Sequence, residues 1–221
     1  MGTSNSKDFQ IREIQPGDIP SVVDVHLASF QNFFLTYLGR AFLERLYREI
    51  AQELGGAFVV ATAPDGGIVG FAAGVPHLSR FYRKLARKRW LDFGLASLGA
   101  ALRRPVIIPR LWRALHASES AGLSPCPAAL MSIAVAPGTK RSGVGRSLVR
   151  HFLARMAQNG ATHVCLTTDR DDNAPTIGFY ESLGFWRVRE FQTREGRWIC
   201  EFMIDTPSEP EGPLLAPRPI P

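Results

Sequence analysis

The most informative part of the sequence is a glycine-containing stretch between two predicted elements: Val135-Ala-Pro-Gly-Thr-Lys-Arg-Ser-Gly-Val-Gly-Arg146. It follows an apolar run, Ala129 to Val135, that is typical of a buried strand, and it leads into a helical pattern from Gly143 to Asn159. Glycines at such a junction let the backbone approach a ligand, and a helix N-terminus carries about half a positive charge. We therefore expect this stretch to bind a phosphate group. The alternative is a simple turn in which the glycines serve geometry alone.

Two better-known phosphate loops do not fit the stretch. A P-loop needs Lys and then Ser or Thr directly after its second glycine, whereas Val144 and Gly145 follow Gly143. A dinucleotide-binding fingerprint needs a third glycine where Leu148 stands, and no later acidic residue fits the ribose contact. Both of these nucleotide-binding classes are therefore excluded.

The flanking sequence predicts alternating helices and strands. Upstream, apolar spacing and turn residues predict a strand from Phe9 and a helix capped by Asp18. They also predict a second helix that has Leu54 on its apolar face and stops at Gly55. A hairpin of strands 57–63 and 68–75 follows. Downstream they predict a strand at 163–168, a short helix at 174–183 and a hairpin of strands 185–191 and 198–204.

Two blocks of this sequence together resemble the GNAT superfamily of N-acetyltransferases. The first is Val135-x-Pro137-x-x-Lys140-x-x-Gly143-x-Gly145-x-x-Leu148, which is similar to the acetyl-CoA-binding motif of that family, and the second is Asn173 followed by Phe179-Tyr180 and Gly184-Phe185. The resemblance covers residues 9–204 and is strongest over 131–186. It implies an α/β (α+β) fold with a mixed, mostly antiparallel central sheet flanked by helices, here with a basic helical insert.

The resemblance also implies a role for each matching position. The main-chain N–H groups of the loop would hold the CoA diphosphate, the preceding strand would pair with the pantetheine arm in a gap between splayed strands, and Tyr180 would protonate the leaving thiolate. Packing in the core is the other interpretation of Tyr180. The implied cofactor-binding residues are Ile133, Ala134, Val135, Lys140, Arg141, Ser142, Gly143, Val144, Gly145, Arg146, Ser147, Asn173 and Phe179.

The sequence departs from the family pattern in two places. Lys140 stands where Arg or Gln is usual, and Arg141-Ser142 replaces a common Gly-Lys, so charge is kept while the loop geometry can differ. The strand 129–135 lacks the carboxylate that some members use as general base. A primary amine is protonated at neutral pH and must lose that proton before it attacks. His77, His116 and Glu119 are candidate bases, and catalysis by positioning alone is the alternative.

The function implied is transfer of an acetyl group from acetyl-CoA, as co-substrate, to a primary amine by direct attack. The acceptor is expected to be an amino sugar or another small molecule. The alternatives are a protein N-terminal or lysine acetyltransferase, and a non-catalytic CoA-binding module. No metal is expected, since Asp169, Asp171 and Asp172 fit a solvated acidic loop before a helix better than a metal site.

Length and composition set the domain organisation. With 221 residues, 45% hydrophobic residues and a net charge of +6, the chain is too apolar to be disordered, and it has no long uncharged apolar run. We expect a flexible N-terminus at 1–8, a single domain at 9–205 with an insert at 76–130, and a disordered proline-rich tail at 206–221. Three widely spaced cysteines and the lack of a signal-peptide pattern favour the cytoplasm.

The insert concentrates the positive charge. Between Arg80 and Arg113 there are ten basic residues and one acid, Asp92. A lid over an anionic or phosphate-bearing acceptor, a homodimer contact, a surface that lies on anionic lipid and a solvated basic helix are the competing roles. Nucleic-acid binding ranks lower, because no aromatic residues alternate with the basic ones in a recognised motif.

Overall fold

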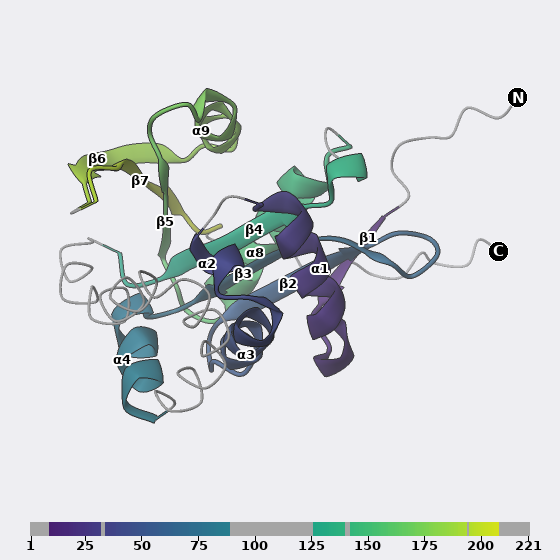
Figure 1. The fold of residues 1–221 in the computed structure, drawn as a ribbon. Coiled ribbons are helices and arrows are strands. Elements are labelled where there is room, and N and C mark those ends of the chain that lie inside the picture. The colour runs from purple at the N-terminus through teal and green to yellow at the C-terminus, as the bar shows by residue number, and fades with distance from the viewer. Residues whose placement is uncertain (1–8, 32–33, 89–125, 140–141, 194, 208–221) are drawn as a thin grey trace, which may run out of the picture.

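The computed structural model describes residues 9–31, 34–88, 126–139, 142–193 and 195–207. Over these residues the chain forms a seven-stranded sheet with the strand order β1-β2-β3-β4-β5-β7-β6 (Figure 1). All neighbouring strands are antiparallel except β4 and β5, which are parallel. The strands are β1 Gln10–Glu13, β2 Ala57–Thr62, β3 Ile68–Val75, β4 Ala129–Val135, β5 His163–Asp169, β6 Trp186–Gln192 and β7 Trp198–Asp205. The predicted fold class is confirmed.

The helices cover both faces of the sheet. They are α1 Ile19–Ser29, α2 Phe34–Tyr37, α3 Arg40–Ala51, α4 Leu78–Lys88, α8 Val144–Gln158 and α9 Ala174–Glu181, with 3₁₀ turns at Pro16–Asp18 and Pro137–Thr139. Residues of α1, α3 and α4 pack into one hydrophobic cluster, while residues of α8 and α9 pack into a second one. Because side chains alternate along a strand, β2 and β3 contribute to both clusters.

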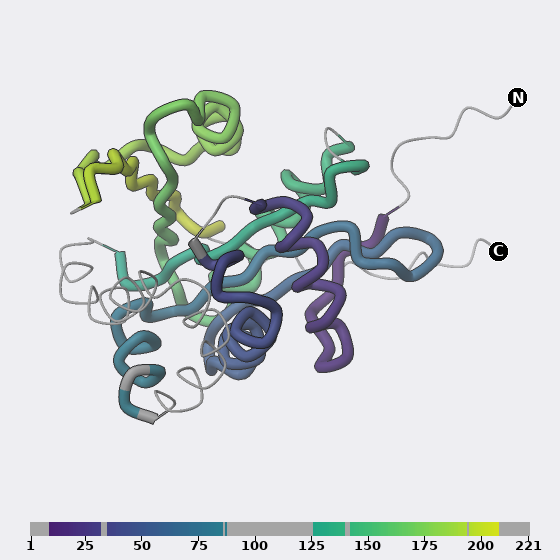
Figure 2. Tube along the Cα trace, viewed as in Figure 1, coloured from purple at the N-terminus to yellow at the C-terminus, as the bar shows by residue number. Residues whose placement is uncertain are grey.

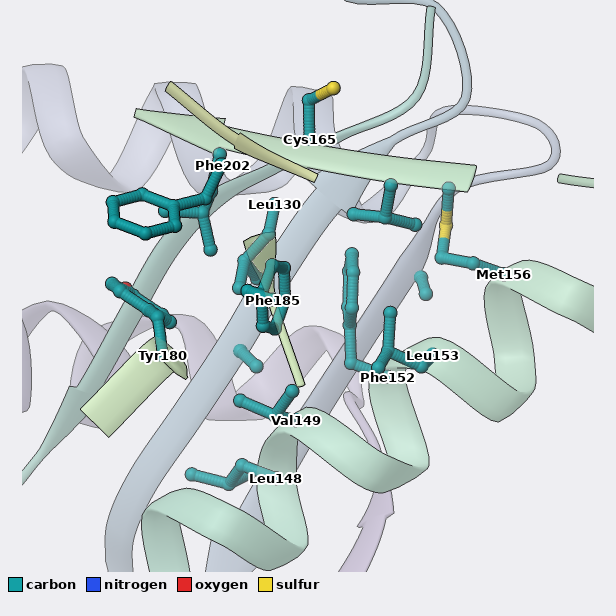
Figure 3. Packing of buried hydrophobic residues seen from close by; sticks show 14 of the residues in the cluster. Leu130, Leu148, Val149, Phe152, Leu153, Met156, Cys165, Tyr180, Phe185 and Phe202 are labelled. Atoms are coloured by element: carbon teal, nitrogen blue, oxygen red, sulfur yellow. The ribbon is translucent and has the colours of Figure 1, made fainter. Parts of the chain in front are cut away.

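The core beneath α8 follows directly from the spacing of apolar residues along that helix. Leu148, Val149, Phe152 and Met156 recur at helical spacing, and each is at most 1% exposed (Figure 3). Burying side chains of this size contributes about 1.5–3 kcal/mol each. The helix that the sequence predicted from Gly143 to Asn159 is confirmed as Val144–Gln158.

The predicted end of the second helix was wrong. The second helix ends at Ala51, so Leu54 is 91% exposed instead of buried. Gly55, with a φ of 75°, then turns the chain toward β2. Asp18 occupies the predicted N-cap position of α1, although its side chain makes no cap hydrogen bond there. Its carboxylate instead pairs with Arg12 at 2.6 Å and accepts the Gln15 N–H at 2.7 Å.

Cys126 is buried in the segment that precedes β4. Its sulfur donates to the Ala128 carbonyl at 3.2 Å. A hydrogen bond with the Cys165 thiol lowers the pKa of Cys126, and burial opposes that shift. Cys165 and Cys200 are also buried, and none of the three cysteines is in a disulfide.

The ends of the chain and most of the insert lie outside the described residues, namely 1–8, 89–125 and 208–221. Within the insert, α4 buries Phe81 and Leu85, and Lys84 pairs with Glu53 at 2.6 Å. Thr206, which the sequence assigned to the tail, donates its hydroxyl to the Ala161 carbonyl at 2.6 Å. Among the helices described, none is long and apolar enough to cross a membrane.

Candidate active site

The sheet opens between β4 and β5. The two strands pair at a single position, Ala129 with Cys165, where the Cys165 N–H donates to the Ala128 carbonyl at 2.9 Å. Beyond this point they diverge (Figure 1). β4 lies in the middle of the sheet, yet Met131, Ser132, Ile133 and Val135 are only half-buried, whereas the last six residues of β3 are buried.

A bulge in β4 lies at the start of this opening. The register between β3 and β4 shifts by one residue, because Ala73 faces Ser132 while the next residue, Gly74, faces Leu130. The extra residue, Met131, leaves β4 locally bent, and such bulges also increase strand twist. The bend gives a physical reason for the two strands to separate.

The backbone of β4 presents hydrogen-bonding groups to the gap. Ala136 donates its N–H to the Val69 carbonyl at 2.8 Å, which places that pair in the hydrogen-bonded set of the antiparallel ladder. By alternation, the N–H and C=O groups of Ile133 and Val135 point away from β3, toward the gap, while those of Ala134 face β3. Ser29 at the end of α1 donates its hydroxyl to the Val135 carbonyl at 3.2 Å.

The start of α8 adjoins the end of β4. Figure 2 shows the chain running from β4 into this helix. Gly143 precedes the helix with a φ of 85°. Because glycine has no side chain, it cannot accept a hydrogen bond from the N–H groups of the first helical turn. A Cβ on Gly145 would lie 3.3 Å from Phe179 Cζ and 3.7 Å from Val135 Cγ2. The structure therefore brings Val135, Gly145 and Phe179 together.

Other predicted residues of the loop have local partners. The Ser142 hydroxyl donates to the Thr139 carbonyl at 2.6 Å, and the Ser147 N–H donates to the Gly143 carbonyl at 3.0 Å. Arg146 donates to the carbonyl and hydroxyl oxygens of Ser182, which connects α8 to the end of α9. Val144 is 1% exposed and belongs to the core beneath α8. Lys140 and Arg141 lie outside the described residues.

Tyr180 packs in the core next to the gap. Its ring lies against Phe179, Phe185 and Phe202, and the residue is 7% exposed (Figure 3). Burial raises the pKa of Tyr180 to about 12, so the phenol is protonated at neutral pH. Among the described residues the hydroxyl has no hydrogen-bond partner, which leaves it available to a ligand.

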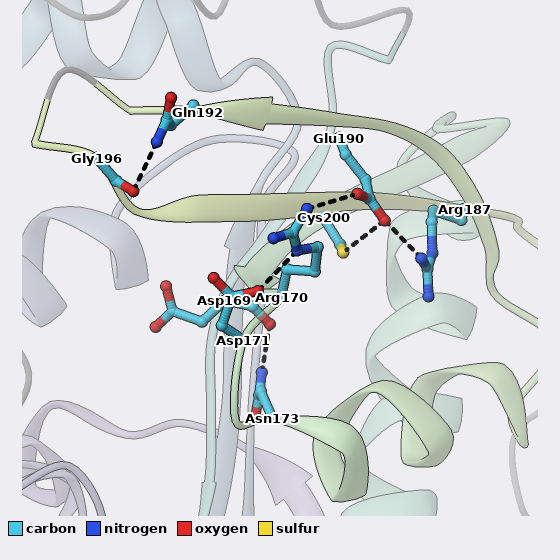
Figure 4. A network of polar contacts seen from close by, with 9 residues as sticks. All are labelled: Asp169, Arg170, Asp171, Asn173, Arg187, Glu190, Gln192, Gly196 and Cys200. Atoms are coloured by element: carbon cyan, nitrogen blue, oxygen red, sulfur yellow. Dashed lines mark hydrogen bonds and ion pairs between the residues drawn. The ribbon is translucent and has the colours of Figure 1, made fainter.

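Asn173 begins α9 inside a polar network (Figure 4). Its side-chain N–H groups donate to Thr168 Oγ1 at 2.7 Å and to the Asp169 carbonyl at 2.8 Å, so only the amide oxygen remains for a ligand. Arg197 holds the Asp169 carboxylate at 2.5 Å, and Arg170 holds that of Asp171 at 2.7 Å. In the described part of the chain, no group of three or more His, Cys, Asp or Glu residues could hold a metal.

The base candidates from the sequence receive little support. His77 is exposed just before α4, and His116 and Glu119 lie outside the described residues. The structure instead places three polar side chains in a row that sequence reasoning missed. His26 Nδ1 lies 2.6 Å from the Tyr47 hydroxyl, which lies 3.0 Å from Ser132 Oγ. The available signal was a histidine and a tyrosine on the apolar faces of two helices.

Comparisons with known sequences find acetyltransferases that are similar to part of the chain. The model of the "Acetyltransferase (GNAT) family" matches residues 107–185. The [Ribosomal protein bS18]-alanine N-acetyltransferase of Escherichia coli K12 is 38% identical over 74 residues, which are 32% of this chain and 49% of that protein. A mycothiol acetyltransferase of Kocuria rhizophila is 36% identical over 79 residues, or 35% of this chain and 25% of that one. The chain thus spans half or less of these relatives.

Solved structures share the fold across almost the whole chain. The E. coli ribosomal-protein-S18-alanine N-acetyltransferase has a TM-score of 0.56 at 17% identity, covering 92% of this chain and 97% of that one. The structure titled SsHAT has a TM-score of 0.64 at 22% identity, covering 90% and 99%. Residues 107–185 are thus similar to the GNAT acetyltransferase family, and the solved structures show that the fold is shared.

Proposed function

We propose that the protein is an acetyl-CoA-dependent N-acetyltransferase that acetylates a primary amine. The observation that carries the proposal is the gap beside β4, where, among the described residues, no strand pairs with Ile133 and Val135 on the side away from β3 and only Ser29 binds the Val135 carbonyl. The gap lies next to a helix start that suits a diphosphate. A solved structure of the same fold, yncA from Salmonella typhimurium, holds acetyl-CoA; it has a TM-score of 0.56 at 13% identity and covers 93% of this chain and 99% of that one.

The cofactor would extend from α8 along β4. Its diphosphate would accept hydrogen bonds from the N–H groups that follow Gly143, where the helix dipole is positive. The pantetheine arm would pair with Val135 and then with Ile133, as an added strand does at an open sheet edge. Each strand residue advances the arm by about 3.3 Å, so the thioester would lie toward the bulge at Met131 and Ser132.

The reaction would proceed by direct attack. The neutral amine nitrogen forms a bond to the thioester carbon, the C–S bond breaks, and the CoA sulfur leaves as a thiolate that takes up a proton. A thiol has a pKa of about 8.5, so the phenol of Tyr180, at about 12, is the weaker acid. We therefore assign Tyr180 to donating a hydrogen bond to the departing CoA sulfur. The proton that this sulfur finally takes up comes from solvent by way of the Tyr180 hydroxyl.

The acceptor has two candidates. The name of the E. coli relative points to the alanine amine of a ribosomal protein, and hence to a peptide N-terminus. The basic insert points to an amino sugar or another small amine with a phosphate group, but most of that insert lies outside the described residues. Both candidates present a primary amine, and the same thiol-release assay distinguishes them.

Calorimetry with CoA and a thiol-release assay test the proposal. We expect CoA and acetyl-CoA to bind, and thiol release to rise with one class in a panel of alanine-starting peptides, amino sugars and polyamines. Binding without thiol release for any amine would support the non-catalytic module instead. If neither CoA nor acetyl-CoA bound, both the acetyltransferase proposal and the non-catalytic CoA-binding module would be overturned.

A further inference from the structure

Three polar side chains form a chain of hydrogen bonds from the hydrophobic core to the gap. His26 of α1 and Tyr47 of α3 are 2% and 1% exposed, whereas Ser132 of β4 is half-buried. The links measure 2.6 Å from His26 Nδ1 to the Tyr47 hydroxyl and 3.0 Å from that hydroxyl to Ser132 Oγ. These hydrogen bonds therefore connect two inaccessible side chains, His26 and Tyr47, to Ser132, which a ligand can reach.

This arrangement has an energetic cost that a purely structural core could avoid. His26 Nε2 is buried and, in the described part of the chain, has no hydrogen-bond partner. Leaving such a group unpaired costs about 1–3 kcal/mol. A leucine at position 26 would fill similar space between Phe30 and Tyr47 without that cost. An unpaired buried group of this kind calls for a functional explanation.

The direction of these hydrogen bonds depends on the His26 tautomer. In the tautomer that leaves Nδ1 unprotonated, Tyr47 donates to His26 Nδ1, and the Tyr47 oxygen accepts the Ser132 hydroxyl proton. The 2.6 Å separation suits an O–H donor. Ser132 Oγ then keeps its lone pairs for a group in the gap. Burial lowers the pKa of His26 to about 4, so the imidazole stays neutral and can accept at physiological pH.

In the proposed binding mode, Ser132 lies where the acceptor amine would arrive. It is next to Ile133, whose peptide groups face the gap, and it belongs to the bulge at which β4 and β5 separate. Its side chain meets Tyr47 on the face covered by α1 and α3, so it would approach the thioester from the side of the sheet opposite α8.

We propose that Ser132 accepts a hydrogen bond from the N–H of the acceptor amine, and that His26 and Tyr47 are positioning residues that hold its lone pair toward that amine. This inference rests on the proposed acetyl transfer and assigns a residue to the place where β4 lacks a carboxylate. The hydrogen bond aligns the nitrogen lone pair with the thioester carbon. The proton released from nitrogen passes to solvent, and the departing sulfur takes its proton separately.

The hydrogen-bonded side chains His26, Tyr47 and Ser132 position the amine and do not accept its proton. An alkyl amine has a pKa of about 10, and the pKa of His26 is about 4, so transfer along the chain to His26 is unfavourable by about a million-fold. Alignment alone is a sufficient role, since a misplacement of about 1 Å can cost about a hundredfold in rate.

Thiol release under saturating substrates tests the assignment. We expect Ser132→Ala and Tyr47→Phe each to lower kcat by about ten- to a hundredfold, with the Kd of CoA unchanged, and Ser132→Thr to retain most activity. The double variant should be no slower than Ser132→Ala, because Tyr47 acts through Ser132. Tyr82→Phe removes a hydroxyl from the same core cluster and is the matched control. An unchanged kcat in Ser132→Ala, or multiplicative losses in the double variant, would overturn the proposal.

Nitrogen NMR of the free protein provides a readout that needs no acceptor. We expect the His26 imidazole to show the neutral tautomer protonated at Nε2, and Tyr47→Phe to perturb its Nδ1 shift. An imidazole protonated at Nδ1 would reverse the hydrogen bonds and overturn the proposal. Thiol release by none of the amines, with the expected tautomer present, would instead count against the acetyl transfer while leaving the hydrogen-bond chain established.

Discussion

At the scale of single residues, Tyr180 has the chemistry that its surroundings dictate most clearly. Its ring is enclosed by Phe179, Phe185 and Phe202, and burial raises its pKa to about 12. We predict that Tyr180→Phe lowers kcat by about ten- to a hundredfold and leaves CoA affinity and thermal stability nearly unchanged, because the ring is preserved. Stopped thiol assays and calorimetry measure the three quantities. Equal kcat values for the two proteins would remove Tyr180 from the reaction.

His26 leads to a prediction about acid stability. Its folded-state pKa of about 4 lies below the unfolded value of about 6.5, so between these pH values the unfolded chain binds more protons. The stabilisation is complete above pH 6.5 and is lost as the pH falls toward 4, by up to about 3 kcal/mol. Urea unfolding at a series of pH values should show that the free energy of unfolding of His26→Gln changes less between pH 6.5 and pH 4 than that of the parent protein. If the free energy of unfolding changed with pH equally in His26→Gln and in the parent protein, the assignment would be contradicted.

At the scale of elements, the start of α8 depends on one backbone conformation. Gly143 has a φ of 85°, and a Cβ there would meet nothing within 4 Å, so the penalty for a side chain is purely conformational. We predict that Gly143→Ala loses about 1 kcal/mol of stability and weakens CoA binding, because the first-turn N–H groups shift. Urea unfolding and calorimetry measure the two effects.

Gly138→Ala is the control for that variant. Gly138 also has open space around its Cβ position, but no left-handed φ. We expect it to change neither stability nor CoA binding appreciably, and Gly143→Asn to be milder than Gly143→Ala, since Asn tolerates the left-handed region better. If Gly138→Ala and Gly143→Ala behaved alike, the conformation at Gly143 would not be what the loop requires.

Local patterns in the sequence predicted most of the elements. The helical pattern after Gly143 predicted α8, and the resemblance implied the splayed strands. The end of α3 was missed, since Leu54 continues the apolar spacing although the chain has already turned. Spacing describes a helix face but contains no information about where tertiary packing stops.

Parts of the candidate site could not be predicted because they depend on distant residues. Tyr47 and Ser132 are 85 positions apart in sequence, and no local pattern states that they touch. The bulge at Met131 has no local signature either, because it is defined by the register with β3. Asn173 was correctly placed at the start of α9, but its N–H groups are taken by Thr168 and Asp169.

At the scale of the whole molecule, the gap divides the sheet into two unequal parts. β1 to β4 form one part and β5, β7 and β6 the other, with direct strand pairing between them only at Ala129 and Cys165. α8 bridges the parts from one face, since its cluster contains residues from both (Figure 3). A ligand strand in the gap would add hydrogen bonds to β4 and stabilise the folded state, by about 2.7 kcal/mol at 100 times Kd.

This division predicts an alternating pattern of amide protection along β4. CoA in the gap should slow hydrogen exchange at the amides of Ile133 and Val135, which face the gap, by more than at Ala134, whose N–H already bonds to β3. Exchange measured by NMR with and without CoA distinguishes the three neighbours. Phe71, which pairs with Ala134 across the ladder, is the internal control for global stabilisation. Uniform slowing at all four amides would mean that CoA stabilises the fold without lying along β4, and the arm would then have to be placed elsewhere.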